Sequence, residues 1–308
     1  MEDNRFFEEM KITITGASGF VGSNLKDYLG ASNQISSLSI RFSPDQKFEI
    51  QTDAVIHLAG KAHDLKKVSD PEEYYQANYE LTKQLFNAFL VSKAKVFIFV
   101  STVKAVADQV EEVLTEDTIA SPVTHYGIAK LQAEKYLLSK KLPNGKRIYI
   151  LRPTMIHGPG NKGNLNLLYK LAAKGLPWPL AAFDNQRSFL SIQNFCYIVK
   201  KLIEKEKIES GIYNCTDDEF LSTNELVQII SSVLNKKHRS IEIPKQFING
   251  IAKIGDLIKF PLNSETVQKL TENYRVSNHK IKNAIGIEKL PYTAKEGLEK
   301  TIKSFINK

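Results

Sequence analysis

The chain has 308 residues, of which 42% are hydrophobic and 25% charged, proportions typical of a globular protein with a sizeable core. Its formal net charge is +8, but its lysines are interspersed with acids, as over residues 200–207, so we expect solvated surfaces and no nucleic-acid partner. No apolar run approaches the ~20 residues of a membrane-spanning helix, and we expect a cytoplasmic protein with no membrane partner.

The two cysteines indicate neither a disulfide framework nor a metal site. Cys196 and Cys215 show no metal-ligand spacing, and no further cysteine is available to build a cluster. We therefore expect both thiols to be reduced and buried in the core, and we expect no bound metal.

A glycine-rich turn near the N-terminus is the first segment that carries chemistry. A β-branched run at residues 11–14 predicts a strand, and the apolar spacing of residues 20–29 predicts a helix. Glycines between them permit a tight turn and close approach to a pyrophosphate, which the free N–H groups of the helix start would face. The spacing is Gly-x-x-Gly-x-x-Gly, and an ordinary structural turn is the alternative. We expect a dinucleotide to be bound by Gly16, Ser18, Gly19, Phe20, Val21 and Gly22.

The second predicted strand, residues 35–42, carries Arg41 near its end. In dinucleotide-binding folds this end meets the adenosine ribose, where an acid favours NAD and an arginine pairs with the 2′-phosphate of NADP. Arg41 favours NADP, whereas a merely solvated loop arginine leaves NAD open. We expect either NAD or NADP as the cofactor.

A third strand at residues 54–58 leads into small residues that a cofactor can approach closely. We expect Leu58, Ala59 and Gly60 to line the cofactor site, and we interpret His57 as a structural histidine at the strand end. After this strand, Asp70 is a helix-capping residue followed by a proline and two acids. This pattern predicts a long helix that reaches about residue 92.

Strands and helices continue to alternate up to residue 153. Residues 95–100 and 147–151 are predicted strands, and residues 126–140 form the helix between them. The alternation predicts an α/β fold of the Rossmann type, with a doubly wound parallel sheet. Ligands of such sheets bind beyond the carboxyl ends of the strands, where all of these motifs fall.

The pattern changes in the second half, which carries helical segments separated by short strands. We expect residues 10–160 to form the dinucleotide-binding domain and residues 161–308 to form a smaller, mixed α/β substrate-binding part, with residues 186–215 returning to the first domain. A capping box at residues 222–225 predicts a helix start. Residues 247–260 have helical apolar spacing, which we interpret as a core or lid helix in preference to a membrane contact.

A tyrosine and a lysine lie four residues apart at the start of the helix at residues 126–140. Tyr126 and Lys130 therefore share one helix face, and an ammonium beside a phenol lowers the tyrosine pKa. Such a tyrosine exchanges a proton with a hydroxyl or carbonyl near neutral pH. Ser101 and Thr102 end the preceding strand, so their hydroxyls can bond the same substrate oxygen.

Together these motifs resemble the extended short-chain dehydrogenase/reductase family over nearly the whole chain from Met10. The resemblance implies that Tyr126 is the catalytic acid/base and that Lys130 holds the nicotinamide ribose and polarises the tyrosine. It also implies that Thr102 is the catalytic hydroxyl, with Ser101 beside it, and that Pro153 lies against the cofactor.

The second half is similar to the nucleotide-sugar branch of this family, the UDP-galactose 4-epimerase-like proteins. In that branch the residues corresponding to Asn164 and Arg187 contact the nucleotide diphosphate, and guanidinium suits phosphate oxygens. His157 stands where many relatives have tyrosine. The 4,6-dehydratase relatives carry an Asp-Glu pair after the catalytic threonine, whereas this chain has Val103 and Lys104, so we do not expect dehydration.

The resemblance implies a 4-epimerase of a UDP-hexose or UDP-N-acetylhexosamine that acts through a 4-keto sugar, as in surface-polysaccharide synthesis. The alternative is an NADPH-dependent 4-keto-sugar reductase, which uses the same three catalytic residues. A dinucleotide-sensing protein without catalysis is a third hypothesis, but such proteins often lose the tyrosine that this chain keeps. A homodimer through the helices at residues 72–92 and 126–140 is common in the family and is possible here.

Overall fold

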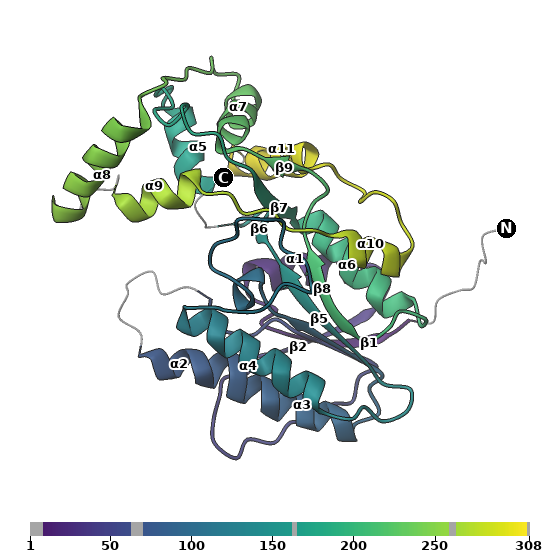
Figure 1. The fold of residues 1–308 in the computed structure, drawn as a ribbon. Helices are drawn as coiled ribbons and strands as arrows, with labels where there is room; N and C mark the ends of the chain where they lie inside the picture. The colour runs from purple at the N-terminus through teal and green to yellow at the C-terminus, as the bar shows by residue number, and fades with distance from the viewer. Residues whose placement is uncertain (1–8, 63–69, 162–164, 259–262, 307–308) are drawn as a thin grey trace.

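The computed structural model describes residues 9–62, 70–161, 165–258 and 263–306, and its core is a parallel sheet (Figure 1). The sheet has six strands in the order β2-β1-β3-β4-β5-β8. Every neighbouring pair in it is parallel, as the alternating pattern predicts. The strands are β1 (Lys11–Thr15), β2 (Gln34–Leu38), β3 (Ala54–His57), β4 (Val96–Val100), β5 (Arg147–Pro153) and β8 (Gly211–Cys215).

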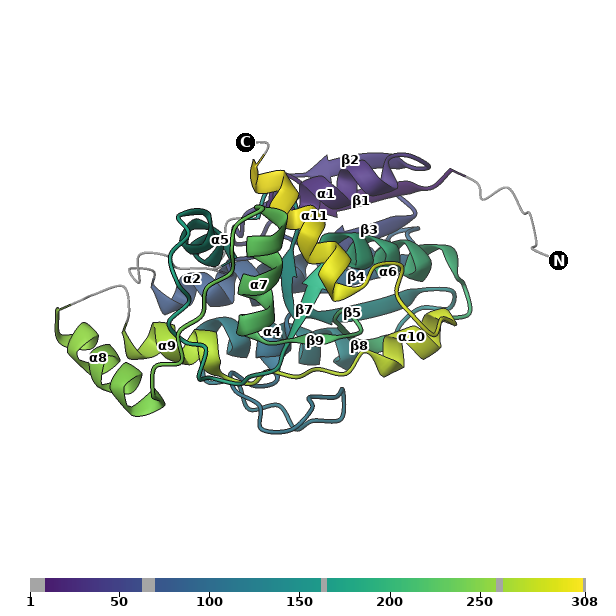
Figure 2. The same cartoon turned by 90° about the horizontal axis from the view of Figure 1, so that it is seen from above.

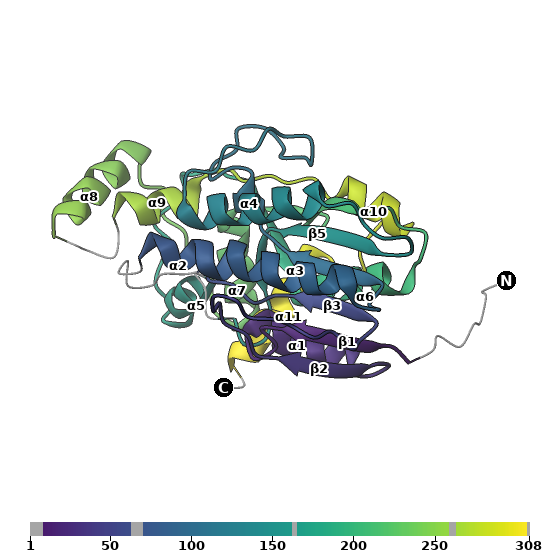
Figure 3. The ribbon, with the colours of Figure 1, turned by 90° about the horizontal axis from the view of Figure 1, so that it is seen from below.

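Helices cover both faces of this sheet because its central strands are apolar on both sides. Phe97 and Phe99 of β4 pack with α3 (Leu81–Val91) and α4 (His125–Ser139), as Figure 3 shows from below. The alternate residues Val96 and Ile98 belong to the other face, which α1 (Phe20–Leu29) and α6 (Ile192–Glu204) cover. Period-two alternation between two apolar faces is typical of a buried parallel sheet. The predicted doubly wound fold is confirmed.

The long helix predicted after Asp70 is present, with a π-helical turn inside it. Asp70 caps α2 (Pro71–Tyr75) by accepting a hydrogen bond of 3.0 Å from the Glu72 N–H. The π-helical turn η1 (Gln76–Glu80) then leads directly into α3. Such π turns are often found at functional sites, because the extra residue redirects a side chain. Here the turn carries the buried Asn78.

The second strand is shorter than predicted. β2 ends at Leu38, which pairs with Thr15, the last residue of β1. Because β2 is the edge strand and β1 is its one partner, pairing stops where β1 turns away into the glycine loop. Arg41 therefore lies in the segment after the strand and is exposed.

The second half builds a smaller sheet and a second hydrophobic core above the first (Figure 1). In this sheet β7 (Arg187–Ser191) lies between β6 (Met155–His157), to which it is parallel, and β9 (Phe220–Leu221), to which it is antiparallel. The chain also returns to the large sheet through α6, β8 and α10 (His279–Ile285), which pack in its core. The remaining helices and helical turns are η2 (Val103–Ala105), α5 (Leu165–Ala173), α7 (Thr223–Val233), α8 (Lys245–Ile258), α9 (Ser264–Thr271) and α11 (Ala294–Ile306).

Local predictions hold in several places. Ser222 and Glu225 form the capping box at the start of α7. Cys196 and Cys215 are free and buried. Burial raises the pKa of the Cys196 thiol to about 12, so both the position and the protonation state of this cysteine are those of an inert core thiol.

Of the two interpretations of residues 247–260, a core helix is wrong for most of its apolar residues, and a lid helix stays a prediction. In α8, Ile248 and Ala252 are buried, but Phe247, Ile254 and Leu257 are 68%, 59% and 84% exposed. Figure 2 shows this helix at the outer end of the molecule, beside α9. Within the described ranges, none of the helices combines the length and apolarity needed to traverse a bilayer.

Candidate active site

The glycine turn has the tight geometry that its sequence predicts. Gly16 has φ +69°, and a Cβ on this residue would lie 2.9 Å from the Ala59 nitrogen. A Cβ on Gly22 would lie 2.3 Å from the Gly16 carbonyl oxygen, so only glycine lets α1 start this close to the turn. Ser18 and Gly19 are exposed where the helix begins. The turn therefore presents its backbone N–H groups at the edge of the sheet, which fits the pyrophosphate of a dinucleotide.

A cavity of ≈ 400 Å³ opens between the segment after β2, the loop after β3 and the helical run that follows Asp70. Three residues predicted from sequence to bind the cofactor line it, namely Arg41, Ala59 and Gly60. Phe20 and Val21 are half-buried in the first turn of α1, while Leu58 follows the end of β3. The structure thus brings the predicted cofactor residues to one edge, although Arg41 reaches it from a loop and not from a strand.

His57 ties the ends of β1 and β3 together, as its structural interpretation predicts. Its Nδ1 lies 2.7 Å from the Thr15 hydroxyl, and its Nε2 lies 3.0 Å from the Thr82 hydroxyl of α3. The same Thr15 oxygen accepts hydrogen bonds from the N–H groups of Leu58 and Ala59. Burial, helped by the charge of Lys130, lowers the pKa of His57 to about 3, so the ring is neutral and structural.

Thr102 and Tyr126 meet at the carboxyl end of β4. Thr102 follows the strand and caps η2 by accepting a hydrogen bond from the Lys104 N–H, 3.2 Å away. Tyr126 lies in the first turn of α4, which Thr124 caps by accepting a hydrogen bond of 3.2 Å from the Gly127 N–H. The Thr102 hydroxyl lies near enough to the Tyr126 phenol to favour its phenolate form. Two of the predicted catalytic groups therefore lie close together.

The expected lowering of the Tyr126 pKa by Lys130 is wrong for this structure. Burial raises the pKa of Tyr126 to about 12, and the nearby Thr102 hydroxyl offsets only part of this effect. Lys130 is directed elsewhere: its Nζ donates to the Val100 carbonyl at 2.9 Å and lies 4.6 Å from the centre of the Phe99 ring. The phenol is consequently protonated at neutral pH.

Lys130 is itself strongly perturbed. Burial lowers its pKa to about 8, and the carboxylate of Glu134, one turn further along α4, acts in the opposite direction. Lys130 is 4% exposed, so its ammonium is enclosed at the end of β4. This side chain can exchange its proton close to physiological pH.

Ser101 does not share the position of Thr102. Its buried hydroxyl donates a short hydrogen bond to Glu134, and the role of Ser101 in substrate binding stays a prediction. Adjacent residues of an extended chain point to opposite faces, which is why only one of the two hydroxyls meets Tyr126. Pro153, the other predicted residue of this region, is buried at the carboxyl end of β5.

On the substrate side, Arg187 begins β7 and is anchored to the C-terminal end of α9. Its guanidinium donates a short hydrogen bond to the Lys269 carbonyl, and its Nη2 lies 3.7 Å from Glu272 Oε1. Lys104 is close enough that Arg187 and Glu272 both influence its pKa. The ammonium of Lys104 also lies 4.6 Å from the Tyr274 ring centre. Cationic groups therefore gather beyond Thr102, whereas the predicted Asn164 lies outside the described residues.

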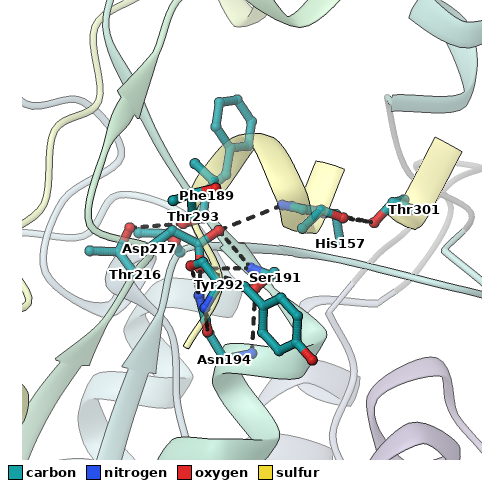
Figure 4. A network of polar contacts seen from close by, with 12 residues as sticks. His157, Phe189, Ser191, Asn194, Thr216, Asp217, Tyr292, Thr293 and Thr301 are labelled. Atoms are coloured by element: carbon teal, nitrogen blue, oxygen red, sulfur yellow. Dashed lines mark hydrogen bonds and ion pairs between the residues drawn. The ribbon is translucent and has the colours of Figure 1, made fainter. Parts of the chain in front are cut away.

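Two buried polar residues that stabilise the loops at the carboxyl edge of the sheet were not predicted from the sequence. Asn78 accepts a hydrogen bond from the Lys61 N–H and donates one to the Lys61 carbonyl, which fixes the loop after β3. Asp217 accepts hydrogen bonds from the Ser191 backbone and from Asn194, and lies 3.8 Å from His157 Nε2 (Figure 4). Neither residue has a clear signal in the sequence, because Asn78 stands among polar and aromatic residues and Asp217 stands in the polar run of residues 216–219.

The Asp217 network joins β6, β7, α6 and α11. His157 bonds the Thr301 hydroxyl of α11 at 2.9 Å through its Nδ1 (Figure 4). Burial lowers the pKa of His157 to about 4 and raises the pKa of Asp217 to about 7, although hydrogen bonds from Asn194 and Ser191 favour the carboxylate. His157 is thus a neutral residue whose hydrogen bond to Thr301 links the two halves of the chain.

Comparison with known proteins agrees with this geometry. A family model described as the NAD dependent epimerase/dehydratase family matches residues 12–216. The UDP-glucose 4-epimerase of Vibrio cholerae is 29% identical over 320 residues, which cover 96% of this chain and 95% of the relative. The N-acetyl-alpha-D-glucosaminyl-diphospho-ditrans,octacis-undecaprenol 4-epimerase of Escherichia coli O157:H7 is 29% identical over 316 residues, 94% of each chain.

A solved structure shows the same fold. The Bordetella bronchiseptica enzyme WbmG in complex with NAD and UDP has a TM-score of 0.73 at 17% identity, over 98% of this chain and 95% of that one. The family resemblance drawn from the sequence motifs is confirmed. The chain belongs to the NAD-dependent epimerase/dehydratase family.

Proposed function

We propose that the protein is a 4-epimerase of a UDP-hexose or UDP-N-acetylhexosamine. The observation that carries this proposal is the placement of Thr102 beside Tyr126 at the end of β4, with Lys130 one turn further along α4. Two relatives that match nearly the whole chain are by name 4-epimerases of sugars carried on a diphosphate. Glycine-rich turn, cavity and catalytic pair lie along the same edge of the sheet, so cofactor and sugar would meet there.

Tyr126 would move the proton of the sugar 4-hydroxyl. Thr102 is placed to bond the same oxygen, which fixes its position while the proton is transferred to or from the phenol. Lys130, enclosed at the end of β4, would position the cofactor ribose. The bound nicotinamide supplies reversible hydride transfer at C4 of the sugar. Net inversion then requires the 4-keto sugar to present its other face before reduction.

The diphosphate of the substrate would be bound by Arg187 and Lys104. Both are partly buried cations beyond Thr102, and each feels the charge of Glu272. A guanidinium binds phosphate oxygens bidentately, so Arg187 is the stronger candidate, with Asn164 expected beside it. A diphosphate is common to UDP-sugars and to the polyprenyl-linked sugar in the name of the E. coli relative, and the same cations would serve either substrate.

The proposal is tested by incubating the protein with UDP-glucose, UDP-galactose and their N-acetylated counterparts and following the anomeric signals by proton NMR. We expect interconversion of one C4 pair without added cofactor. Tyr126→Phe should abolish it, whereas Tyr136→Phe, whose hydroxyl bonds Asn87 on the outside of the same helix, should not. Full turnover by Tyr126→Phe would refute the mechanism.

A 4-keto-sugar reductase is the second candidate, and Arg41 at the cavity is the observation that favours it. A reductase must exchange its cofactor each cycle, whereas an epimerase regenerates it in place. Mass spectrometry of the dinucleotide released from the denatured protein separates the two: stoichiometric NAD supports the epimerase, and an empty site that prefers NADPH supports the reductase. A dinucleotide sensor would bind cofactor but convert no sugar.

We further propose that the chain forms a homodimer through α3 and α4.

A further inference from the structure

Helix α8 carries an apolar face that the protein does not cover. Phe247, Ile251, Ile254 and Leu257, hereafter the outer face of α8, are 68%, 46%, 59% and 84% exposed. On the inner side of the same helix, Ile248 and Ala252 are each 1% exposed and belong to the second hydrophobic core. The helix is therefore held in place by its inner side alone.

The outer face is continuous along the helix and is separate from the side chains that anchor the helix in the core. At about 100° per residue, its four side chains fall within a sector of about 120°, next to the sector of Ile248 and Ala252. Lys245, Asn249 and Asp256 occupy the opposite, polar side. Isolated exposed apolar residues are ordinary, but four on one face of a 14-residue helix form a patch of the kind that marks an interaction surface.

The helix also stands in a position suited to contact with a large partner. It lies at the outer end of the molecule in all three ribbon views (Figures 1, 2 and 3). It packs beside α9 through Asp256, whose carboxylate accepts hydrogen bonds from the Ser264 backbone and hydroxyl. The carbonyl of Lys269 in α9 in turn accepts a hydrogen bond from Arg187. A surface bound to α8 would thus lie on the substrate side of the protein.

The charged residues of α8 and of the segment that precedes it are mainly basic. Residues 236–258 contain five basic and two acidic residues. Lys236, Lys237 and Arg239 are exposed in the segment that leads into α8, and Lys253 borders the outer face next to Leu257. The two acids are Glu242 and Asp256, and Asp256 is engaged with Ser264. An apolar helix face bordered by basic residues is the signature of a helix that lies in the interface of an anionic bilayer.

We propose that α8 is a membrane-surface anchor, whose outer face inserts among the lipids of an anionic bilayer while Lys253 and the basic segment 236–239 contact the headgroups. Fourteen residues give a helix of about 21 Å, which lies along a bilayer surface and does not span about 30 Å of hydrocarbon. A second copy of the chain is a poorer occupant, because one face of so short a helix offers far less than the about 800 Å² per partner of a stable interface. It would also bring the basic segments of the two copies together. This proposal revises the sequence-based expectation of no membrane contact.

Vesicle flotation with the purified full chain tests the proposal. We expect the protein to float with vesicles of phosphatidylethanolamine and phosphatidylglycerol, less with phosphatidylcholine vesicles, and less at high salt. The variant Phe247→Ser/Leu257→Ser should partition at least about tenfold more weakly. The matched control is Ile119→Ser/Val123→Ser, which removes two apolar side chains that are 90% and 77% exposed elsewhere, and it should float like the wild type.

Three results would overturn the proposal. The first is a wild-type protein that stays with the buffer in the presence of anionic vesicles, and the second is a control variant that loses flotation as strongly as the α8 variant. The third is light scattering that shows a wild-type dimer and a monomeric α8 variant, since the outer face would then be covered by a second copy. A dimer through α3 and α4 would persist in the α8 variant. Flotation involves no turnover, so it is read independently of the proposed 4-epimerase activity.

Discussion

Arg152 and Glu134 form a bidentate ion pair that joins β5 to α4 inside the protein. Arg152 Nη2 lies 2.5 Å from Glu134 Oε2, and its Nε lies 3.1 Å from both carboxylate oxygens. The two residues are 4% and 1% exposed. The same carboxylate accepts the Ser101 hydroxyl and faces Lys130 one turn earlier on the helix. The pair therefore fixes the helix that carries the candidate catalytic residues.

Removing one partner of this pair should be costly. In Glu134→Ala the Arg152 guanidinium is left buried without a counter-charge, and we expect the free energy of unfolding to fall by about 3–5 kcal/mol. Urea denaturation followed by circular dichroism measures this. Glu80→Gln is the control, because it breaks the half-exposed pair with Lys83 and should change stability by less than about 0.5 kcal/mol. Equal losses in the two variants would contradict the prediction.

Cofactor binding should weaken as the pH rises through about 8. The pKa of Lys130 is lowered to about 8 by burial, so above this pH the side chain loses its charge and a donor toward the ribose. Titration calorimetry with NAD and NADP between pH 6.5 and 9.5 measures the dependence. Lys130→Met should bind weakly at every pH. Glu134→Gln should shift the midpoint to lower pH, because Glu134 favours the charged lysine; an unchanged midpoint would argue against Lys130 as the titrating group.

The fold and the local parts of the site could be predicted from sequence because the signals are local. The positive φ of Gly16 follows from the glycine itself, and the capping role of Asp70 follows from the residues directly after it. The pKa of Tyr126 could not be predicted, because burial at the end of β4 outweighs the lysine four residues away. The sequence favours Thr102 over Ser101 as the catalytic hydroxyl, but it does not show that Ser101 bonds Glu134, because this contact depends on how α4 packs against the end of β4. Likewise, the spacing of residues 247–260 describes an apolar helix but not which side is covered.

The neutral His57 should make the protein less stable in acid. Its pKa is about 3 in the folded protein against 6.5 as the ordinary value, so the unfolded chain binds more protons between these pH values. Stability is complete above pH 6.5 and falls as the pH decreases, by about 2 kcal/mol at pH 5. His57→Gln keeps partners for Thr15 and Thr82 and should flatten this slope. Asp217, whose raised pKa acts in the opposite direction, is present in both proteins and cancels in their difference.

Arg41 should determine how strongly NADP competes with NAD. The residue lines the cavity beside Ala59 and Gly60, where a 2′-phosphate would gain a charge-assisted partner. We expect Arg41→Ala to weaken NADPH binding about tenfold or more while NADH binding changes little, as measured by the fluorescence of the reduced cofactors. Arg239→Ala, an exposed arginine at the far end of the second half, is the control for net charge. An equal loss of affinity for NADPH and NADH in Arg41→Ala would show that Arg41 does not contact the 2′-phosphate.

Arg187 should act in substrate binding and not in the chemical step. Its guanidinium is held by the Lys269 carbonyl and Glu272, so it is preorganised beyond Thr102 without contact to Tyr126 in the described interactions. Arg187→Ala should raise KM for a nucleotide sugar by about 10- to 100-fold, the loss of a charge-assisted hydrogen bond, with a much smaller effect on kcat. Lys269→Met is the matched control, because it removes an exposed ammonium paired with Glu265 but keeps the carbonyl that holds Arg187. If kcat fell and KM stayed constant in Arg187→Ala, the residue would belong to the catalytic step, and diphosphate recognition would have to be assigned to Lys104.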